Sequence, residues 1–464
     1  MIAESMPATY PDLPKPPSLW KSIGPSFVLL GMALGSGELI MWPYLTARYG
    51  LGLLWGALLG ISLQYVLNTE IMRYTLAWGE SVFVGWRKLW KYLPVWFILS
   101  TAIPWSIPGF SSAVAAIFHH LLPNVPVAVA GVFFLLITGL LLSMGKSAYH
   151  TMEKFQKISI LISVSFLVIL TLGMAHYHDW IAAMGGLVGQ GEGWKFFPPA
   201  VSLMAFLGAF AYSGAGGNLN LAQSYYVKEK GLGMAQRLPK ITALFGARHQ
   251  EHLLTGQTFS MTAANMKTWK KWWWLISTEH LIVFWGLGLI SIIFLAVLAY
   301  TTVHNHPQVA GSNLQFLFLE AGVIGSQTWP LIRVWFLVVG MLMLFSTQLG
   351  VMASSARIIS ENLILLTKPL TTPVKLSRLY YMVLWTQLAL GMVILLLGFS
   401  EPQYLLTLGA VLNAFAMLGG FILILILNKK SLPLELQPKL GRTILLVLGI
   451  IVFAVFCLLT LASL

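Results

Sequence analysis

Long apolar stretches recur along the whole chain, and each is long enough to cross a lipid bilayer. A spanning helix needs about 20 mostly apolar residues. Eleven such stretches are predicted, at residues 23–46, 51–74, 93–120, 125–145, 155–176, 197–226, 272–303, 328–356, 377–399, 403–428 and 441–463. Only 9% of the 464 residues are charged, whereas soluble domains have about 25%. We therefore expect an all-α polytopic membrane protein in contact with the bilayer.

The distribution of Lys and Arg predicts how the chain is oriented. If residues 1–22 form a cytoplasmic tail, all of the 28 basic residues except Arg48, Lys195 and Arg333 fall on the inner side. Cytoplasmic loops carry such an excess. The expected protein therefore lies in a bacterial inner membrane, with its N-terminus in the cytoplasm and its C-terminus outside. The net charge of +13 is explained by these loops, so no nucleic-acid partner is expected.

Two glycine-rich segments interrupt apolar stretches, at positions where glycines and an acid would destabilise a regular membrane-spanning helix. The first comprises Gly35, Ser36, Gly37 and Glu38, and the second comprises Ala215, Gly216, Gly217 and Asn218, preceded by Ser213 and Gly214. Each Gly costs a helix about 1 kcal/mol relative to Ala, and a charge at mid-bilayer costs roughly 2.5–3.5 kcal/mol or more. Irregular backbone is tolerated at that depth where it lines a protein cavity. The segments therefore predict discontinuous spans 1 and 6.

The spacing of these two segments predicts an internal repeat. Spans 1 and 6 lie five spans apart, and an odd number of spans gives the two halves opposite membrane orientations. We expect a first repeat at 23–176, a second at 197–428 with an inner loop at 227–271, and an extra span at 441–463. In such transporters the discontinuous helices of the two repeats form the substrate site. The alternative is that the glycines serve only close helix packing.

Several short motifs resemble the NRAMP family of divalent-metal transporters, which share the leucine-transporter (LeuT) fold. The motifs begin at Gly24-Pro25 and continue through the first glycine-rich segment. They return at 49–55, at 63–65 and at 217–221. The resemblance covers most of the chain. It implies a LeuT-like fold with eleven transmembrane helices, a 5+5 inverted repeat and a transport role.

The sequence departs from the family pattern at the metal-binding positions. The family has Asp-Pro-Gly-Asn where this chain has residues 35–38, and Met-Pro-His-Asn where it has residues 215–218. A later family histidine aligns with Gln223. Residues 94–118 contain no Asp or Glu, so the span 3 acids expected for proton movement are missing. NRAMP-related magnesium transporters also lack the Met, so the chain resembles a divergent member of that kind.

The remaining polar residues define a candidate site. The substrate-binding candidates are Gly35, Ser36, Gly37, Glu38, Ala215, Gly216, Gly217, Asn218 and Asn220, with Glu38 and Asn218 as possible metal ligands. The candidates for gating or for lining the cavity are Gln64, Tyr212, Ser213 and Gln223. Glu38 has an alternative role as a first-turn acid that complements a helix dipole. Asn220 has an alternative role as a packing residue.

This set of ligands leaves four hypotheses for the function. Oxygen ligands without sulfur suit hard cations, and Mg²⁺ keeps several waters and needs few protein ligands. The first hypothesis is a Mg²⁺ transporter that uses alternating access without proton coupling. The second is a transporter of bicarbonate, another small anion or a small organic solute, because half-helix N-termini attract anions. The third is a transporter of a transition metal, and the fourth is a receptor or scaffold without flux. No motif indicates an enzyme or a cofactor, and the oligomeric state is left open.

Overall fold

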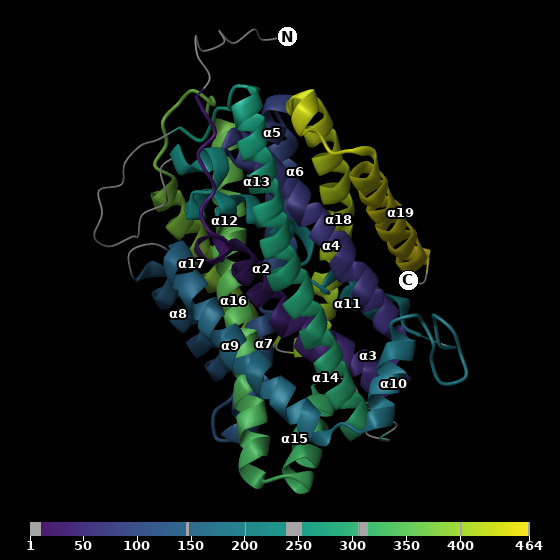
Figure 1. The fold of residues 1–464 in the computed structure, drawn as a ribbon. Helices are drawn as coiled ribbons and strands as arrows, with labels where there is room; N and C mark the ends of the chain where they lie inside the picture. The colour runs from purple at the N-terminus through teal and green to yellow at the C-terminus, as the bar shows by residue number, and fades with distance from the viewer. Residues whose placement is uncertain are drawn as a thin grey trace.

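The chain folds into a bundle of helices in a computed structural model that describes residues 11–144, 148–199, 201–237, 253–304, 306, 314–399 and 401–462. The side chains of Ser36, Gln403 and Tyr404 are outside this description. Within these ranges no β-strand occurs, and only an isolated bridge joins Gln190 to Lys195. The expected all-α class is confirmed (Figure 1).

The first five spans occupy the N-terminal third of the chain. A short helix α1 (Leu19–Ser22) precedes them, and α5 (Val82–Leu89) and α10 (Tyr177–Gly186) lie outside the spans. Span 1 consists of α2 (Pro25–Ala33), η1 (Leu34–Met41) and α3 (Trp42–Tyr49), and span 2 of η2 (Leu51–Leu53) and α4 (Leu54–Trp78). Spans 3 to 5 are α6 (Leu93–Trp105) with α7 (Gly109–Leu121), then α8 (Val127–Ser143), then α9 (Ala148–Met174).

The remaining spans follow the same pattern. Span 6 consists of α11 (Leu203–Ala211), η3 (Gly217–Ala222) and α12 (Gln223–Lys230), and η4 (Gly233–Arg237) follows it. Span 7 consists of α13 (Ala263–His280), η5 (Leu281–Leu287) and α14 (Gly288–Val303), and α15 (Gln315–Gln327) leads into span 8. Spans 8 to 11 are α16 (Pro330–Thr367), α17 (Leu376–Leu396), α18 (Pro402–Ser431) and α19 (Leu440–Ala462), with η7 (Leu434–Leu436) before the last.

The predicted span count agrees with the helices of the described residues. Nine helices there are long and apolar enough to cross a membrane, and Val127–Ser143 is a shorter apolar helix. The interrupted span 6 completes the eleven. Spans 7 and 8 extend further into the polar side than predicted, because hydropathy does not register the polar helical turns at 263–271 and 357–367. The stretch of the inner loop at 238–252 lies outside the described residues.

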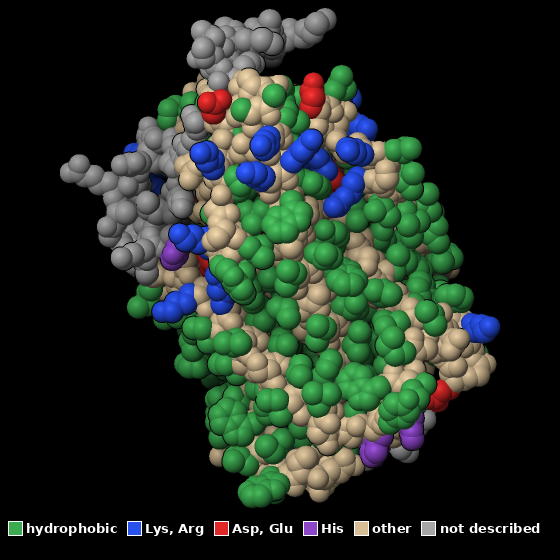
Figure 2. All heavy atoms as spheres, in the orientation of Figure 1, with side chains coloured by type: hydrophobic (Ala, Val, Ile, Leu, Met, Phe, Trp, Pro, Cys, Tyr) green, Lys and Arg blue, Asp and Glu red, His purple; other side chains and the backbone are tan. Residues whose placement is uncertain are grey.

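The bundle is built around α16, which packs against α6, α7, α9 and α17. The view in Figure 1 places α15 at the end of the molecule opposite to α5. On the face that Figure 2 shows, apolar side chains form a broad band across the middle, and Lys and Arg gather at the end where α5 lies. Exposed residues such as Leu161 and Ile169 on α9 belong to the surface that lipid would cover. This is the surface expected of a membrane bundle.

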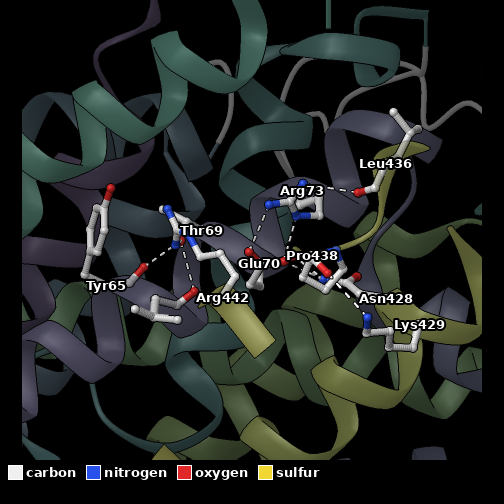
Figure 3. Close-up of polar contacts among 10 residues, drawn as sticks. Tyr65, Thr69, Glu70, Arg73, Asn428, Lys429, Leu436, Pro438 and Arg442 are labelled. Carbon is white, nitrogen blue, oxygen red and sulfur yellow. Dashed lines mark hydrogen bonds and ion pairs between the residues drawn. The ribbon is translucent and has the colours of Figure 1, made fainter. Parts of the chain in front are cut away.

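A polar network fastens the extra span to the basic end of the bundle (Figure 3). Arg73 and Glu70, three residues apart on α4, form an ion pair with N–O distances of 2.7 and 3.1 Å. Arg73 also donates to the carbonyl of Leu436 at 3.1 Å, and Asn428 of α18 donates to Glu70. Arg442, at the start of α19, donates to Thr69 at 2.7 Å. These contacts bind α18 and α19 to span 2.

Candidate functional site

Span 1 is interrupted at the first glycine-rich segment, but not by unwound backbone. Residues Leu34–Met41 form a π-helix that continues directly from α2 into α3. The prediction of a discontinuous span is correct in position and wrong in form: the helix widens and does not open. π-helical turns occur mostly as single insertions at functional sites. The Ser36 side chain lies outside the described residues, so its predicted role stays a prediction.

The two glycines of this π-helix face two different spans. The Gly35 amide donates to Thr347 Oγ1 of α16 at 3.0 Å, and that hydroxyl donates to the Gly31 carbonyl, also at 3.0 Å. A Cβ atom at Gly37 would lie 1.7 Å from the carbonyl oxygen of Tyr212 in span 6. Both positions therefore require glycine for close approach of another helix. Both glycines therefore serve close packing, and their predicted part in substrate binding stays a prediction.

Span 6 is unwound where the second segment lies. Regular α-helix ends at Ala211, and a 3₁₀ turn resumes at Gly217. Gly216 and Gly217 have φ angles of 76° and 52°, in a region that L-residues with side chains rarely adopt. A Cβ atom at Gly217 would be 2.0 Å from Asn413 Oδ1 of α18. The predicted discontinuity of span 6 is confirmed.

Glu38 is completely buried, and neither of its carboxylate oxygens has a hydrogen bond of good geometry, although the Ser291 hydroxyl of span 7 lies close enough to interact with it. Its carboxylate faces span 7, where a Cβ atom at Gly288 would be 3.6 Å from Oε1. A buried carboxylate without partners is costly unless a cation or a proton accompanies it. Glu38 is therefore equipped to receive a positive charge from the direction of span 7.

The amides of span 6 use their donors and leave their oxygens free. Asn218 Nδ2 lies 2.7 Å from Ser100 Oγ and 2.9 Å from Thr101 Oγ1 in span 3, while its Oδ1 has no partner. Gln223 Nε2 donates to the Met72 sulfur at 3.3 Å, and its Oε1 has no partner. Both side chains are buried to about 1% exposure or less.

A relay of two amides fixes the orientation of Asn220. Gln64 Nε2 donates to the Ala211 carbonyl at 3.0 Å, which can only accept, so the other end of Gln64 is an oxygen. Asn220 Nδ2 donates to that oxygen at 3.1 Å. The Oδ1 atom of Asn220 is consequently the end without a partner.

The other cavity candidates lie at the crossing of spans 1 and 6. Tyr212 accepts at 3.2 Å from Asn413, whose amide also donates to the Gly409 carbonyl. Ser213 Oγ accepts from Trp42 Nε1 at 3.2 Å and donates to the Ala209 carbonyl. Ala215 is buried beside them. These residues hold the shape of the crossing.

The structure brings some predicted residues together and separates others. It joins Gly37 to Tyr212 and Gln64 to Asn220. It does not join the two predicted metal ligands, because Glu38 faces span 7 and the Asn218 amide faces span 3. In the described part of the chain, no group of three His, Cys, Asp or Glu side chains could hold a metal ion. A cation here would be held mainly by amides, carbonyls and water.

Several polar residues near the site were missed from the sequence. Ser100 and Thr101 contact Asn218, and Thr347 contacts the π-helix. In span 7, Glu279 and His280 both contact Ser26 of span 1, with His280 Nδ1 2.7 Å from Ser26 Oγ. An adjacent acid and histidine within an apolar span are a detectable signal, because ionisable residues at that depth are rare and functional.

Solved structures with the same overall fold are secondary transporters and related proteins. A mutant of the Eremococcus coleocola manganese transporter superposes with a TM-score of 0.65 at 12% identity, covering 98% of this chain and 90% of that one. Mhp1, described as a nucleobase-cation-symport-1 family transporter, gives 0.57 at 13% identity, with 98% and 94% covered. MhsT in complex with L-phenylalanine gives 0.54 at 12% identity, with 94% and 98% covered.

The chain has the LeuT-like fold. No protein-family model and no curated protein sequence matches it. The NRAMP resemblance is thus supported at the level of the LeuT-like fold, and the magnesium-specific part of it remains a prediction. At these identities the comparison carries no information on the substrate.

Proposed function

We propose that this protein is a secondary transporter that moves a small, hard cation such as Mg²⁺ by alternating access. The observation that carries the proposal is the set of free, buried oxygens around the crossing of spans 1 and 6. They belong to Glu38, Asn218, Asn220, Gln223 and Asn413. A cation is the partner that such acceptors lack.

The orientation of the amides supports this proposal. Backbone carbonyls fix Gln64 and Asn413 as donors toward Ala211 and Gly409, and Gln64 in turn fixes Asn220. An anion site would need the opposite arrangement, with the amide nitrogens free. The free oxygens therefore favour a cation over the anion hypothesis.

Hydration explains how separated ligands would serve one ion. Mg²⁺ dehydrates reluctantly and usually keeps several waters. Glu38 and Asn218, our two proposed metal ligands, would contact the hydrated ion from the sides of span 7 and span 3. None of the proposed ligands has sulfur, so preference for a soft transition metal is not expected.

We further propose that transport is not proton-coupled and that the N-terminus faces the cytoplasm of a bacterial cell. The span 3 helices, Leu93–Trp105 and Gly109–Leu121, contain no acid. Lys and Arg gather at one end of the face that Figure 2 shows, and the positive-inside rule supports that end as the cytoplasmic one.

The test is flux into proteoliposomes, comparing Mg²⁺, Mn²⁺ and bicarbonate, each with and without a pH gradient. We expect saturable Mg²⁺ uptake that is independent of the gradient and that Glu38→Gln abolishes. Glu435→Gln, in the short turn before span 11, is the matched control and should transport normally.

Bicarbonate flux without cation flux would establish the anion hypothesis instead. Uptake driven by the pH gradient would overturn uniport and direct attention to Glu279 and His280. No flux of any solute would favour the scaffold hypothesis.

A further inference from the structure

A small cavity lies between α9, α12, α16 and α17, apart from the crossing of spans 1 and 6. Its volume is about 40 Å³, and its walls include the side chains of Tyr149, Tyr225, Tyr226, Tyr380, Glu229 and Arg357. A buried water needs roughly 10–15 Å³ of such volume. The cavity therefore has room for a ligand of about three or four heavy atoms.

Arg357 is the charged group of this cavity. It is 5% exposed. Its Nη2 atom lies 3.3 Å from Glu361 Oε2 and 3.9 Å from Glu229 Oε1, so one end of the guanidinium faces the carboxylates. The Nε and Nη1 atoms have no hydrogen-bond partner. A guanidinium stays charged in proteins and only donates, and unmatched buried donors are costly.

Two of the tyrosines add further unmatched groups. The hydroxyls of Tyr225 and Tyr380 are buried without a partner, whereas that of Tyr226 is bonded to Ser354 and that of Tyr149 interacts with Glu153. The Glu229 carboxylate, which also lines the cavity, lies 3.9 Å from Arg357. The unmatched groups of the cavity are therefore donors, and they lie beside an apolar wall formed by Ala148, Met152 and Ala353.

We propose that this cavity binds a small planar oxyanion, such as a short monocarboxylate. A carboxylate brings acceptor oxygens and no donor, which is what Arg357 and the hydroxyls of Tyr225 and Tyr380 lack. Its carbon end would contact the apolar wall. A cation is disfavoured because the carboxylates of Glu229 and Glu361 already lie beside the guanidinium of Arg357.

The position of the cavity separates this site from the proposed cation site. Arg357 is about 15 Å further along α16 than Thr347, which contacts the span 1 π-helix. The cavity is enclosed by α12, the second half of the discontinuous span 6, and by α9 and α16. A bound oxyanion would link these helices and stabilise the arrangement in which they are packed together.

The experiment is calorimetric titration of the purified full-length protein with acetate, formate, nitrate and bicarbonate at constant ionic strength. We expect saturable binding of at least one of these ions. Tyr225→Phe and Tyr380→Phe keep the ring and remove one hydroxyl, and each should weaken binding about tenfold, because a lost hydrogen bond to a charged group has that effect. Tyr300→Phe, whose hydroxyl bonds Glu192 in another part of the molecule, should bind like the wild type.

Two results would overturn the proposal. The first is the absence of saturable binding of all four ions. The second is binding that both tyrosine variants retain and that Asn220→Ala removes, which would assign the ion to the crossing of spans 1 and 6. Arg357→Lys should also weaken binding. If Arg357→Lys also disturbs Glu229 and Glu361, its effect on binding is ambiguous, and the two tyrosine variants then decide the test. Since Glu38→Gln does not touch this cavity, failure of cation transport and failure of oxyanion binding are distinguishable.

Discussion

Gly37 of span 1 packs against the backbone carbonyl of Tyr212 in span 6, with no room for a methyl group between them. A Cβ atom there would be 1.7 Å from the carbonyl oxygen. The crossing of the two interrupted helices thus depends on one missing side chain. Because the opposing atom belongs to the backbone, it cannot rotate away.

Gly37→Ala should therefore separate spans 1 and 6 and lower the stability of the protein. Overpacking costs about 1–3 kcal/mol, and a contact this short belongs to the upper part of that range. The measurement is the apparent melting temperature in detergent, together with Mg²⁺ flux. Gly322→Ala on α15 is the control, because nothing lies within 4 Å of the added atom. Equal melting temperatures for the two variants would contradict the close contact.

Gln64→Leu should weaken cation binding without removing a ligand. Gln64 orients Asn220 by accepting from its amide nitrogen at 3.1 Å. Without that acceptor the Asn220 side chain can turn, so its oxygen is no longer presented to the ion. We expect roughly a tenfold rise in the half-saturating Mg²⁺ concentration, the equivalent of about 1.4 kcal/mol. Gln327→Leu, at the exposed end of α15, should leave that concentration unchanged.

Glu320 on α15 should make stability depend on pH. Burial raises the pKa of its carboxyl to about 8 from a usual value of 4.5. Between these two values the unfolded chain releases this proton while the folded chain retains it. Unfolding therefore becomes more favourable as pH rises, by about 1.4 kcal/mol per unit for this group. Above pH 8 the effect should level off.

The measurement for Glu320 is the melting temperature in detergent from pH 5 to pH 9. The wild type should lose stability across this interval, and Glu320→Gln should show a flatter profile because it cannot ionise. A profile of equal slope in both proteins would remove Glu320 as the cause. Glu401→Gln, exposed at the start of α18, serves as the comparison.

Lys230→Met should loosen the start of span 1. Glu153 Oε1 accepts from Lys230 at 2.7 Å and from Lys157 at 2.6 Å, and Lys157 also donates to the Ile23 carbonyl at 3.1 Å. These bonds hold α12, α9 and the start of span 1 together. If this side is the cytoplasmic one, as proposed above, removing one of the two cations should increase the time for which the transporter is open to the cytoplasm.

Thiol labelling can follow this opening. Met32, on α2 before the π-helix, is 1% exposed, so a Met32→Cys reporter should react slowly while these helices stay packed together. Lys230→Met should raise the labelling rate several-fold, and Lys154→Met, on the exposed face of α9, should not. The natural Cys457 is buried and contributes little background. Identical labelling rates in both variants would argue against the hypothesis that the bonds of Glu153 hold these helices closed.

Hydropathy and glycine position were sufficient to predict the number of spans and the two interruptions. The eleven spans and the interrupted positions near Gly35 and Gly216 follow from local composition and spacing, whereas the LeuT-like fold was implied by the resemblance to the NRAMP family. The form of the span 1 interruption could not be predicted, because a π-helix at Leu34–Met41 depends on the neighbouring α16 and span 6 backbones. The two glycines predict that an α-helix is unstable at this position, but they do not predict which conformation the neighbouring helices stabilise.

The candidate site was less predictable than the fold. The direction of the Glu38 side chain depends on a helical rotation that one-dimensional spacing cannot determine. The contacts of Asn218 with Ser100 and Thr101 join residues more than a hundred positions apart, and small hydroxyl residues in span 3 carry no distinctive signal. Glu279 and His280 do carry a sequence signal, because an adjacent acid and histidine are rare within an apolar span.

The π-helix of span 1 has a consequence for the rotational phase of everything that follows it. One residue corresponds to about 100° of rotation in an α-helix. A π-helical turn holds more residues than an α-helical turn, so the residues that follow it are rotated relative to a regular α-helix. Leu34–Met41 therefore determines which face of Trp42–Tyr49 packs against span 7. Deletion of a single residue within Leu34–Met41 would shorten the span only slightly. It would nevertheless turn Trp42–Tyr49 away from its present neighbours, so the length of this segment is constrained more strictly than its hydrophobicity.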